Sequence, residues 1–197
     1  MRPPRRSAIP RHARRALELG RLVYLRYPEP EDLEEFVRVR RAGRAQLEPW
    51  EPLAPPGFDA FGVDGFRREL ELRRTDSDER LLICAVDTGE IVGRLSLSGI
   101  VRGVQEQARF GYWTSPHAFG RGYMTEAVGL GLHHCFRRLR LHRVEADVQP
   151  HNIASRRVLE KNGFRLEGFS PRLVKIQGRW ADHERWAITV EEWEPQG

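Results

Sequence analysis

The sequence predicts an α/β fold in which helices pack against a mixed β-sheet. Two observations lead to this prediction. Strand and helix patterns follow one another in the order β-α-α-β-β-β-α-β-α-β-β, so the chain has runs of adjacent strands as well as strands separated by helices. The chain also shows no internal repeat and no second domain, and its 197 residues are enough for one domain with a substantial core.

The first part of the chain predicts one strand followed by two helices. Residues 22–27 have the alternating character of a strand, and a Pro-Glu-Pro turn follows them. Residues 31–41 carry apolar side chains at helical spacing, with acids in the first turn and arginines in the last, as the helix dipole favours. A proline-rich turn at 47–56 leads to a second helix at 59–74.

A β-hairpin and a further strand form the middle of the chain. Residues 81–86 are an unbroken apolar run typical of a buried strand. Residues 91–98 alternate in polarity and are expected to pair back across a turn at 87–90. Residues 107–114 predict the next strand.

The last third of the chain predicts two helices, each followed by strand. Apolar side chains fall on one stripe of a helix that runs to about residue 139. Residues 144–148 predict a strand, and residues 152–162 predict a short helix. Residues 164–177 and 180–190 have the pattern of a final hairpin.

The composition is that of an ordinary globular protein. Hydrophobic residues make up 40% of the chain and charged residues 31%. No apolar run approaches the ~18 residues that a membrane span needs, and the N-terminus lacks the apolar region of a secretory signal. Cys84 and Cys135 do not have the spacing of a metal site or a disulfide framework, so we expect reduced thiols in a cytoplasmic protein.

Arginines concentrate at the N-terminus of a chain whose net charge is +5. We expect residues 1–20 to form a basic tail and residues 21–197 to form a single domain. A basic tail can attract RNA or the ribosome, and it can equally be a solvated, disordered extension. The sequence leaves both alternatives open, and it also leaves open whether the chain forms a homodimer.

A glycine-containing stretch at 119–127 precedes the longer helix of the last third. Gly120 and Gly122 allow consecutive backbone N–H groups to point toward one ligand, and the helix start adds unpaired N–H groups and a positive dipole end. The stretch lacks the third glycine of a dinucleotide fingerprint, where Thr125 stands, and the lysine of a P-loop. It therefore predicts a pyrophosphate site of another kind, with an ordinary tight turn as the alternative.

A second candidate site lies at the start of the short helix. Asn152 is placed to cap this helix by accepting the N–H of Ser155, and capping alone would explain its presence. A cap and a ligand contact are compatible, however. The Asn152 side chain can bond a ligand amide, and the Ser155 hydroxyl can reach a reacting atom.

Together the two sites resemble the GNAT superfamily of acyl-CoA-dependent N-acetyltransferases, and in particular its RimJ/RimL-like group, which acetylates the N-terminal amines of ribosomal proteins. The resemblance covers roughly residues 21–193. It rests on a set of motifs at 47–52, 110–113, 120–127, 141–146, 152–164, Gly168, 178–180, Asp182 and His183. Two departures stand out. Phe119 and Met124 fill the ends of a loop usually written Gln/Arg-x-x-Gly-x-Gly/Ala, and Arg109 stands where related sequences often carry an acid.

The resemblance implies a three-layer sandwich whose central, mostly antiparallel sheet splays between strands 107–114 and 144–148. It implies that acetyl-CoA binds there as cosubstrate and that its acetyl group passes directly to an amine in a ternary complex. The expected acceptor is a protein N-terminal amine. The residues expected to bind acetyl-CoA are Tyr112, Trp113, Thr114, Phe119, Gly120, Arg121, Gly122, Tyr123, Met124, Thr125, Asn152 and Ser155.

The resemblance also suggests residues for the two proton transfers. Ser155 is the candidate acid that protonates the leaving thiolate, directly or through water. Asp147, five residues before Asn152, is the candidate base, although it can also be an exposed strand carboxylate, and water can suffice for an N-terminal amine. Asp182 and His183 are expected to line the acceptor cleft. The histidines have no metal-site spacing, so no metal is expected.

Three other functions fit parts of the sequence. The acceptor can be a small-molecule amine such as an antibiotic or a polyamine. The chain can be a non-catalytic acyl-CoA-binding or ribosome-associated module, which Phe119, Met124 and the uncertain base would allow. An RNA-binding protein that uses the basic tail is a further alternative, but the sequence contains no recognisable RNA motif.

Overall fold

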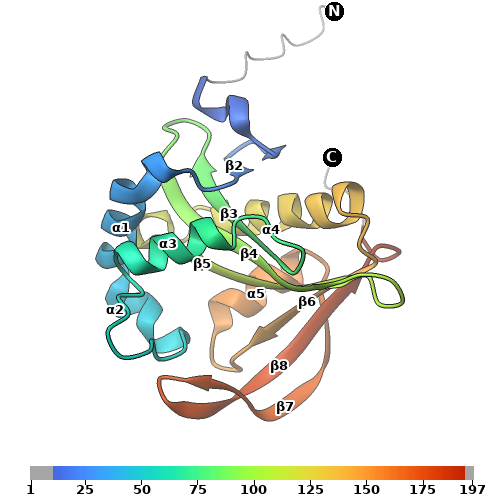
Figure 1. Ribbon diagram of the computed structural model, residues 1–197. Helices are drawn as coiled ribbons and strands as arrows, with labels where there is room; N and C mark the ends of the chain where they lie inside the picture. Colours follow the sequence, from blue (N-terminus) through green and yellow to red (C-terminus); the bar gives the residue numbers. More distant parts are fainter. Residues whose placement is uncertain (1–10, 194–197) are drawn as a thin grey trace, which may run out of the picture.

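Eight strands form one sheet in the computed structural model, which describes residues 11–193 (Figure 1). The sheet order is β1-β2-β3-β4-β5-β6-β8-β7, and all neighbours are antiparallel except β5 and β6. The strands are β1 (Glu18–Leu19), β2 (Val23–Arg26), β3 (Asp78–Ala85), β4 (Ile91–Val101), β5 (Gln107–Thr114), β6 (Arg143–Val148), β7 (Arg165–Ile176) and β8 (Arg179–Thr189). The predicted mixed, mostly antiparallel sheet is confirmed.

Helices cover both faces of this sheet and complete a three-layer sandwich. The α-helices are α1 (Leu33–Ala42), α2 (Arg44–Leu47), α3 (Val63–Glu71), α4 (Tyr123–His133) and α5 (Ile153–Lys161). Shorter 3₁₀ turns are η1 (Arg11–Arg15), η2 (Pro30–Asp32), η3 (Glu48–Trp50) and η4 (Pro116–Ala118), and η5 (His134–Arg138) is a π-helix that extends α4. No helix within residues 11–193 has the length and apolar character needed to cross a membrane.

The two-residue period of the strands sorts their side chains into two cores. Val23 and Leu25 of β2 face the core under α4 and α5, whereas Tyr24 between them faces the core under α1 and α3. Phe36 of α1 and Phe66 of α3 close the second core, with ring centroids 5.1 Å apart. The apolar spacing seen in the sequence therefore places the helices on opposite faces.

The sheet opens at its one parallel seam. β5 and β6 pair over only four residues each, from Gln107 opposite Arg143 to Phe110 opposite Ala146. Beyond this point β5 continues to Thr114 along β4, and β6 continues to Val148 along β8. The facing backbone edges of 111–114 and 147–148 consequently have no strand partner at the seam, which confirms the predicted splay.

The N-terminal segment joins the domain earlier than the sequence suggested. β1 pairs with β2, which places residues 18 and 19 in the sheet although the expected tail ran to residue 20. In η1, Ala13 is buried and the Nε2 atom of His12 lies 2.9 Å from the carbonyl oxygen of Val86. Residues 1–10 lie outside the described residues, so an RNA or ribosome contact through them stays a prediction.

Candidate active site

The turn before α4 presents a row of backbone N–H groups. Gly120 and Gly122 have φ values of 73° and 80°, a left-handed conformation that glycine adopts without strain. Within residues 11–193, none of the N–H groups from 120 to 125 donates to a protein acceptor, and the first helical bond runs from the Glu126 N–H to the Gly122 carbonyl at 3.1 Å. Unpaired N–H groups at the positive end of an 11-residue helix can bind an anion, so this turn is a candidate anion site.

The side chains of this turn leave the N–H groups free. Phe119 is 52% exposed, and Met124 and Tyr123 pack toward the core under α4. The carbonyl of Thr125 accepts a hydrogen bond from Asn162 at 3.1 Å, which ties the first turn of α4 to the end of α5. Because the anion site consists of backbone atoms, the departures at Phe119 and Met124 from the usual loop pattern leave it intact, and Arg121 is exposed beside it.

Glu126, on the first turn of α4, fixes the position of this site. Its carboxylate accepts the backbone N–H groups of Arg21, Leu22 and Val23 at 2.9, 2.7 and 2.7 Å. A Cβ at Gly20 would come within 2.7 Å of the Glu126 carboxyl carbon, so this close approach requires glycine. The helix start is thereby attached to the turn between β1 and β2.

A cavity of about 180 Å³ lies where β5 and β6 separate. It is lined by residues of β5, β6, the start of α5 and β8, together with Trp50 of η3. These residues are Trp50, Phe110, Gly111, Tyr112, Ala146, Asp147, Val148, Gln149, Asn152, Ser155 and His183. The cavity therefore brings together Tyr112, Asp147, Asn152 and Ser155 from the predicted site, with His183 from the expected acceptor cleft.

Trp113 and Thr114 take a different position. The Trp113 side chain is buried under α1, where its ring lies 5.7 Å from Phe36 and the Arg40 guanidinium lies 5.1 Å from it. The Trp113 side chain is thus turned away from the cavity, while the backbone of both residues follows the open edge of β5. We therefore expect them to offer backbone N–H and C=O groups, as an added strand would use them.

A hydroxyl pair connects β5 to α5 inside the cavity. The Tyr112 hydroxyl lies 2.8 Å from Ser155 Oγ, and Asn152 Oδ1 accepts the Ser155 N–H at 3.1 Å, as the capping prediction required. Burial raises the pKa of Tyr112 to about 12, against the smaller lowering by its hydrogen bond with Ser155. Tyr112 therefore stays protonated at neutral pH and can pass a proton to Ser155.

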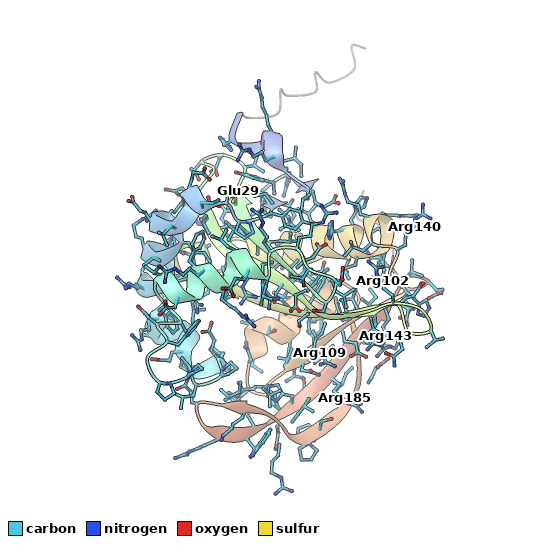
Figure 2. All side chains as sticks on the ribbon, in the orientation of Figure 1. Glu29, Arg102, Arg109, Arg140, Arg143 and Arg185 are labelled. Atoms are coloured by element: carbon cyan, nitrogen blue, oxygen red, sulfur yellow. The ribbon has the colours of Figure 1, made fainter. Side chains whose placement is uncertain are left out.

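Asp147 lines the same cavity and is held in an ion pair. Its Oδ2 atom is 3.0 Å from Arg109 Nε, and Arg109 also donates to Glu145 at 3.0 Å. Arg109 is labelled in Figure 2. Burial raises the pKa of Asp147, while Arg109 and His183 act in the opposite direction. Arg109, which stands where related sequences often carry an acid, therefore holds the Asp147 carboxylate in position.

Contacts far apart in the sequence close the acceptor side of the cavity. Trp50 packs against His151 with ring centroids 5.0 Å apart. Gln177, at the tip of the β7–β8 hairpin, donates to the carbonyls of Glu48 and Glu51 at 2.9 and 3.0 Å. The contacts of Gln177 span more than a hundred residues, so no local pattern in the sequence predicts them.

The arrangement has the parts of an acyl transfer site, and comparisons with known proteins agree. A family model described as an Acetyltransferase (GNAT) domain matches residues 22–165. The chain belongs to the GNAT family. Its resemblance to this family, its fold class and its nature as an acyltransferase are thereby confirmed.

GNAT relatives match most of the chain. The Probable N-acetyltransferase YjcK of Bacillus subtilis (strain 168) is 36% identical over 173 residues, which are 86% of this chain and 94% of that protein. The ribosomal protein uS5-alanine N-acetyltransferase of Escherichia coli (strain K12) is 31% identical over 156 residues, 76% of this chain and 78% of that protein.

A solved GNAT structure gives the same result. Mycobacterium smegmatis RimJ in complex with CoA-disulfide aligns with a TM-score of 0.80 and 38% identity, over 86% of this chain and 83% of that chain. The chain is therefore a GNAT N-acetyltransferase related to enzymes that acetylate ribosomal proteins.

Proposed function

We propose that this enzyme transfers the acetyl group of acetyl-CoA to the N-terminal α-amine of a protein, by direct transfer in a ternary complex. The observation that carries the proposal is the joining of two sites at one seam. The unpaired N–H groups of 120–125 and the Tyr112–Ser155 hydroxyl pair lie at the open end of β5. The related uS5-alanine N-acetyltransferase and the CoA complex of RimJ support both substrates.

The residues present fit acetyl-CoA. The N–H groups of 120–125 would hold its pyrophosphate, and Arg121 would add a positive charge. The unpaired edges of 111–114 and 147–148 would hold the amides of its pantetheine arm. When bound, acetyl-CoA supplies the activated thioester, and a backbone N–H on the splayed strands would stabilise the negative charge that develops on its carbonyl oxygen.

Side chains of the cavity supply the proton transfers. Ser155 Oγ gives its proton to the departing thiolate, and the Tyr112 hydroxyl at 2.8 Å replaces it. Asp147 faces the amine as a carboxylate that can bind its ammonium form or accept a proton from it. Holding the amine and the thioester next to each other lowers the activation free energy by on the order of several kcal/mol, as it does in intramolecular reactions.

The charge around the cavity favours a single amine over a polyamine. Asp147 is paired with Arg109 at 3.0 Å, and Glu184 on β8 is paired with Arg156 at 3.2 Å. A polyamine carries several positive charges, and it would meet an arginine beside each of these carboxylates. A peptide with one terminal ammonium and a neutral backbone avoids this repulsion, because its further atoms can bond along open strand edges.

Two measurements on the purified chain test the proposal. Calorimetry should show acetyl-CoA binding, and free CoA thiol should be released with a panel of peptides that have free N-termini. The same peptides with blocked N-termini serve as the control and should release none. Absence of acetyl-CoA binding would overturn the cosubstrate, and binding with release only on polyamines or antibiotics would replace the peptide acceptor with a small molecule.

A further inference from the structure

One nitrogen of the His183 ring makes no hydrogen bond that stabilises the fold within residues 11–193. His183 lies on β8 with only 4% of its surface exposed, yet its side chain lines the cavity beside Asp147 and Ser155. It is close enough to Asp147 to lower the pKa of that carboxyl. The position therefore combines burial in the protein with access to the reaction space.

The hydrogen bonding of His183 fixes which nitrogen is free. Its Nδ1 atom lies 3.0 Å from the carbonyl oxygen of Ala181, and a carbonyl oxygen only accepts, so Nδ1 carries the proton of the neutral ring. Nε2 then has a free lone pair. It makes no hydrogen bond within residues 11–193, and it is not among the unpaired polar atoms that are sealed from solvent.

Asp147 offers a carboxylate that can bind an ammonium. Its Oδ2 atom is already held 3.0 Å from Arg109 Nε, while burial raises the pKa of the carboxyl. No hydrogen bond within the described residues involves Oδ1. An ammonium seated at Asp147 would lie in the cavity that His183 also lines.

We propose that His183 is a catalytic residue whose Nε2 atom takes a proton from the acceptor ammonium that Asp147 binds. This inference rests on the proposed acetyl transfer to an N-terminal amine. The ammonium gives one proton to Nε2, the imidazolium releases it to water, and the neutral amine keeps its lone pair for attack. The C–N bond then forms and the C–S bond breaks. The serine proton passes to the thiolate, the Tyr112 hydroxyl replaces it, and the second nitrogen proton returns to the Tyr112 oxygen.

The groups that face His183 come from three other elements. Asp147 of β6 is the acidic neighbour, with Arg109 of β5 behind it. The Tyr112 and Ser155 hydroxyls face the same cavity from β5 and α5. Along β8 itself, His183 is flanked by Asp182 and Glu184, and Glu184 is paired with Arg156.

The test replaces His183 with Asn and, separately, with Gln. Asn keeps a donor near the position of Nδ1, and Gln keeps a polar group near Nε2, but neither accepts a proton at neutral pH. His142→Asn is the matched control, because His142 is exposed and pairs with Glu191 at the opposite end of β6. The assay measures kcat/KM against pH with acetyl-CoA and a hexapeptide that begins with alanine.

Removal of the base should produce a loss that depends on pH. At about pH 7 we expect kcat/KM to fall by about 10²-fold in both His183 variants. At about pH 9 most N-terminal amines are already neutral, so the difference from the wild type should narrow. The acetyl-CoA dissociation constant should stay within about twofold of the wild-type value, which also shows that the variants are folded.

Other outcomes overturn the inference in distinguishable ways. A deficit of the same size at every pH, or kcat/KM equal to that of the wild type, would remove His183 as the base while leaving acetyl transfer in place. If the wild type binds acetyl-CoA but acetylates none of the N-terminal peptides, the proposed function fails, and the inference fails with it.

Discussion

The donor and acceptor sides of the site are built from different materials. On the donor side, where we propose that acetyl-CoA binds, the N–H groups of 120–125 are unpaired within residues 11–193, while Phe119 is 52% exposed and Met124 is buried. On the acceptor side, the side chains of Asp147, Ser155 and His183 line the cavity. A backbone site depends on conformation and tolerates changes in side chain. A site made of side chains depends on the identity of each residue.

This difference would allow the enzyme to depart from the usual loop pattern and keep the proposed anion site. It also places the choice of acceptor in a small group of side chains from separate strands. Substitutions on the two sides should therefore differ in kind. Donor-side changes should act through glycine conformation, and acceptor-side changes should act through chemistry.

The largest effect is expected for Ser155→Ala. Loss of the hydroxyl removes the proton donor for the thiolate, so kcat should fall by about 10²-fold while the acetyl-CoA dissociation constant changes by less than about twofold. Steady-state kinetics and calorimetry separate the two quantities. Ser77→Ala, at an exposed serine in the turn before β3, is the control. An unchanged kcat would exclude Ser155 from the mechanism.

Gly122→Val should weaken acetyl-CoA binding by about tenfold or more, because a β-branched residue is strained at positive φ. A Cβ at this position would meet only Leu22 at 3.7 Å, so the effect comes from the backbone and not from a clash. Gly103→Val is a matched control, since Gly103 has a φ of 78° and open space around it. Equal affinity in the Gly122 variant and the wild type would contradict a backbone anion site.

Asp147→Asn should raise the peptide KM by about fivefold, because the variant loses the charged contact between the Asp147 carboxylate and the peptide ammonium. The sign of the pH effect follows from the raised pKa of Asp147. As pH falls, Asp147 takes up a proton earlier than an ordinary aspartate, so wild-type KM should rise toward acidic pH. The variant should show no such rise. Asp87→Asn, in an exposed turn, is the control, and a KM that follows pH equally in both proteins would remove Asp147 from acceptor binding.

Phe119→Ala should have the smallest effect. Phe119 is 52% exposed, and its replacement by alanine should leave the backbone conformation of the turn unchanged. The acetyl-CoA dissociation constant should therefore change by less than about twofold. Calorimetry on the variant sharpens the comparison directly. A tenfold loss would show that the donor side depends on this side chain after all.

Much of the fold was predictable because its signals are local. The apolar runs of β3 and β4, the stripe on α4 and the Asn152 cap each lie within a dozen residues, and the structure places them as expected. The short strand β1 was missed, since two residues carry no period. The pairing of residues 11–19 with the domain depends on contacts such as His12 with Val86, which no local pattern records.

The candidate site divides along the same line. Its glycine turn is visible in the sequence because positive φ restricts the residue type. Its cavity is not, because Trp50, Asp147 and His183 meet only when three distant segments are folded together. The ion pair between Asp147 and Arg109 also depended on strand register, which sets these residues on neighbouring strands.

The carboxylate of Glu126 connects the proposed donor site to the turn between β1 and β2. The first turn of α4 holds the N–H groups of 21–23, so a ligand that binds only the ordered helix end should stabilise β1 and β2 by mass action. Hydrogen exchange at these three amides should consequently slow when acetyl-CoA is added. The exchange rates of these amides would then report whether acetyl-CoA is bound, at a position away from the acceptor. The stability of the first strands of the domain would depend on the acetyl-CoA concentration.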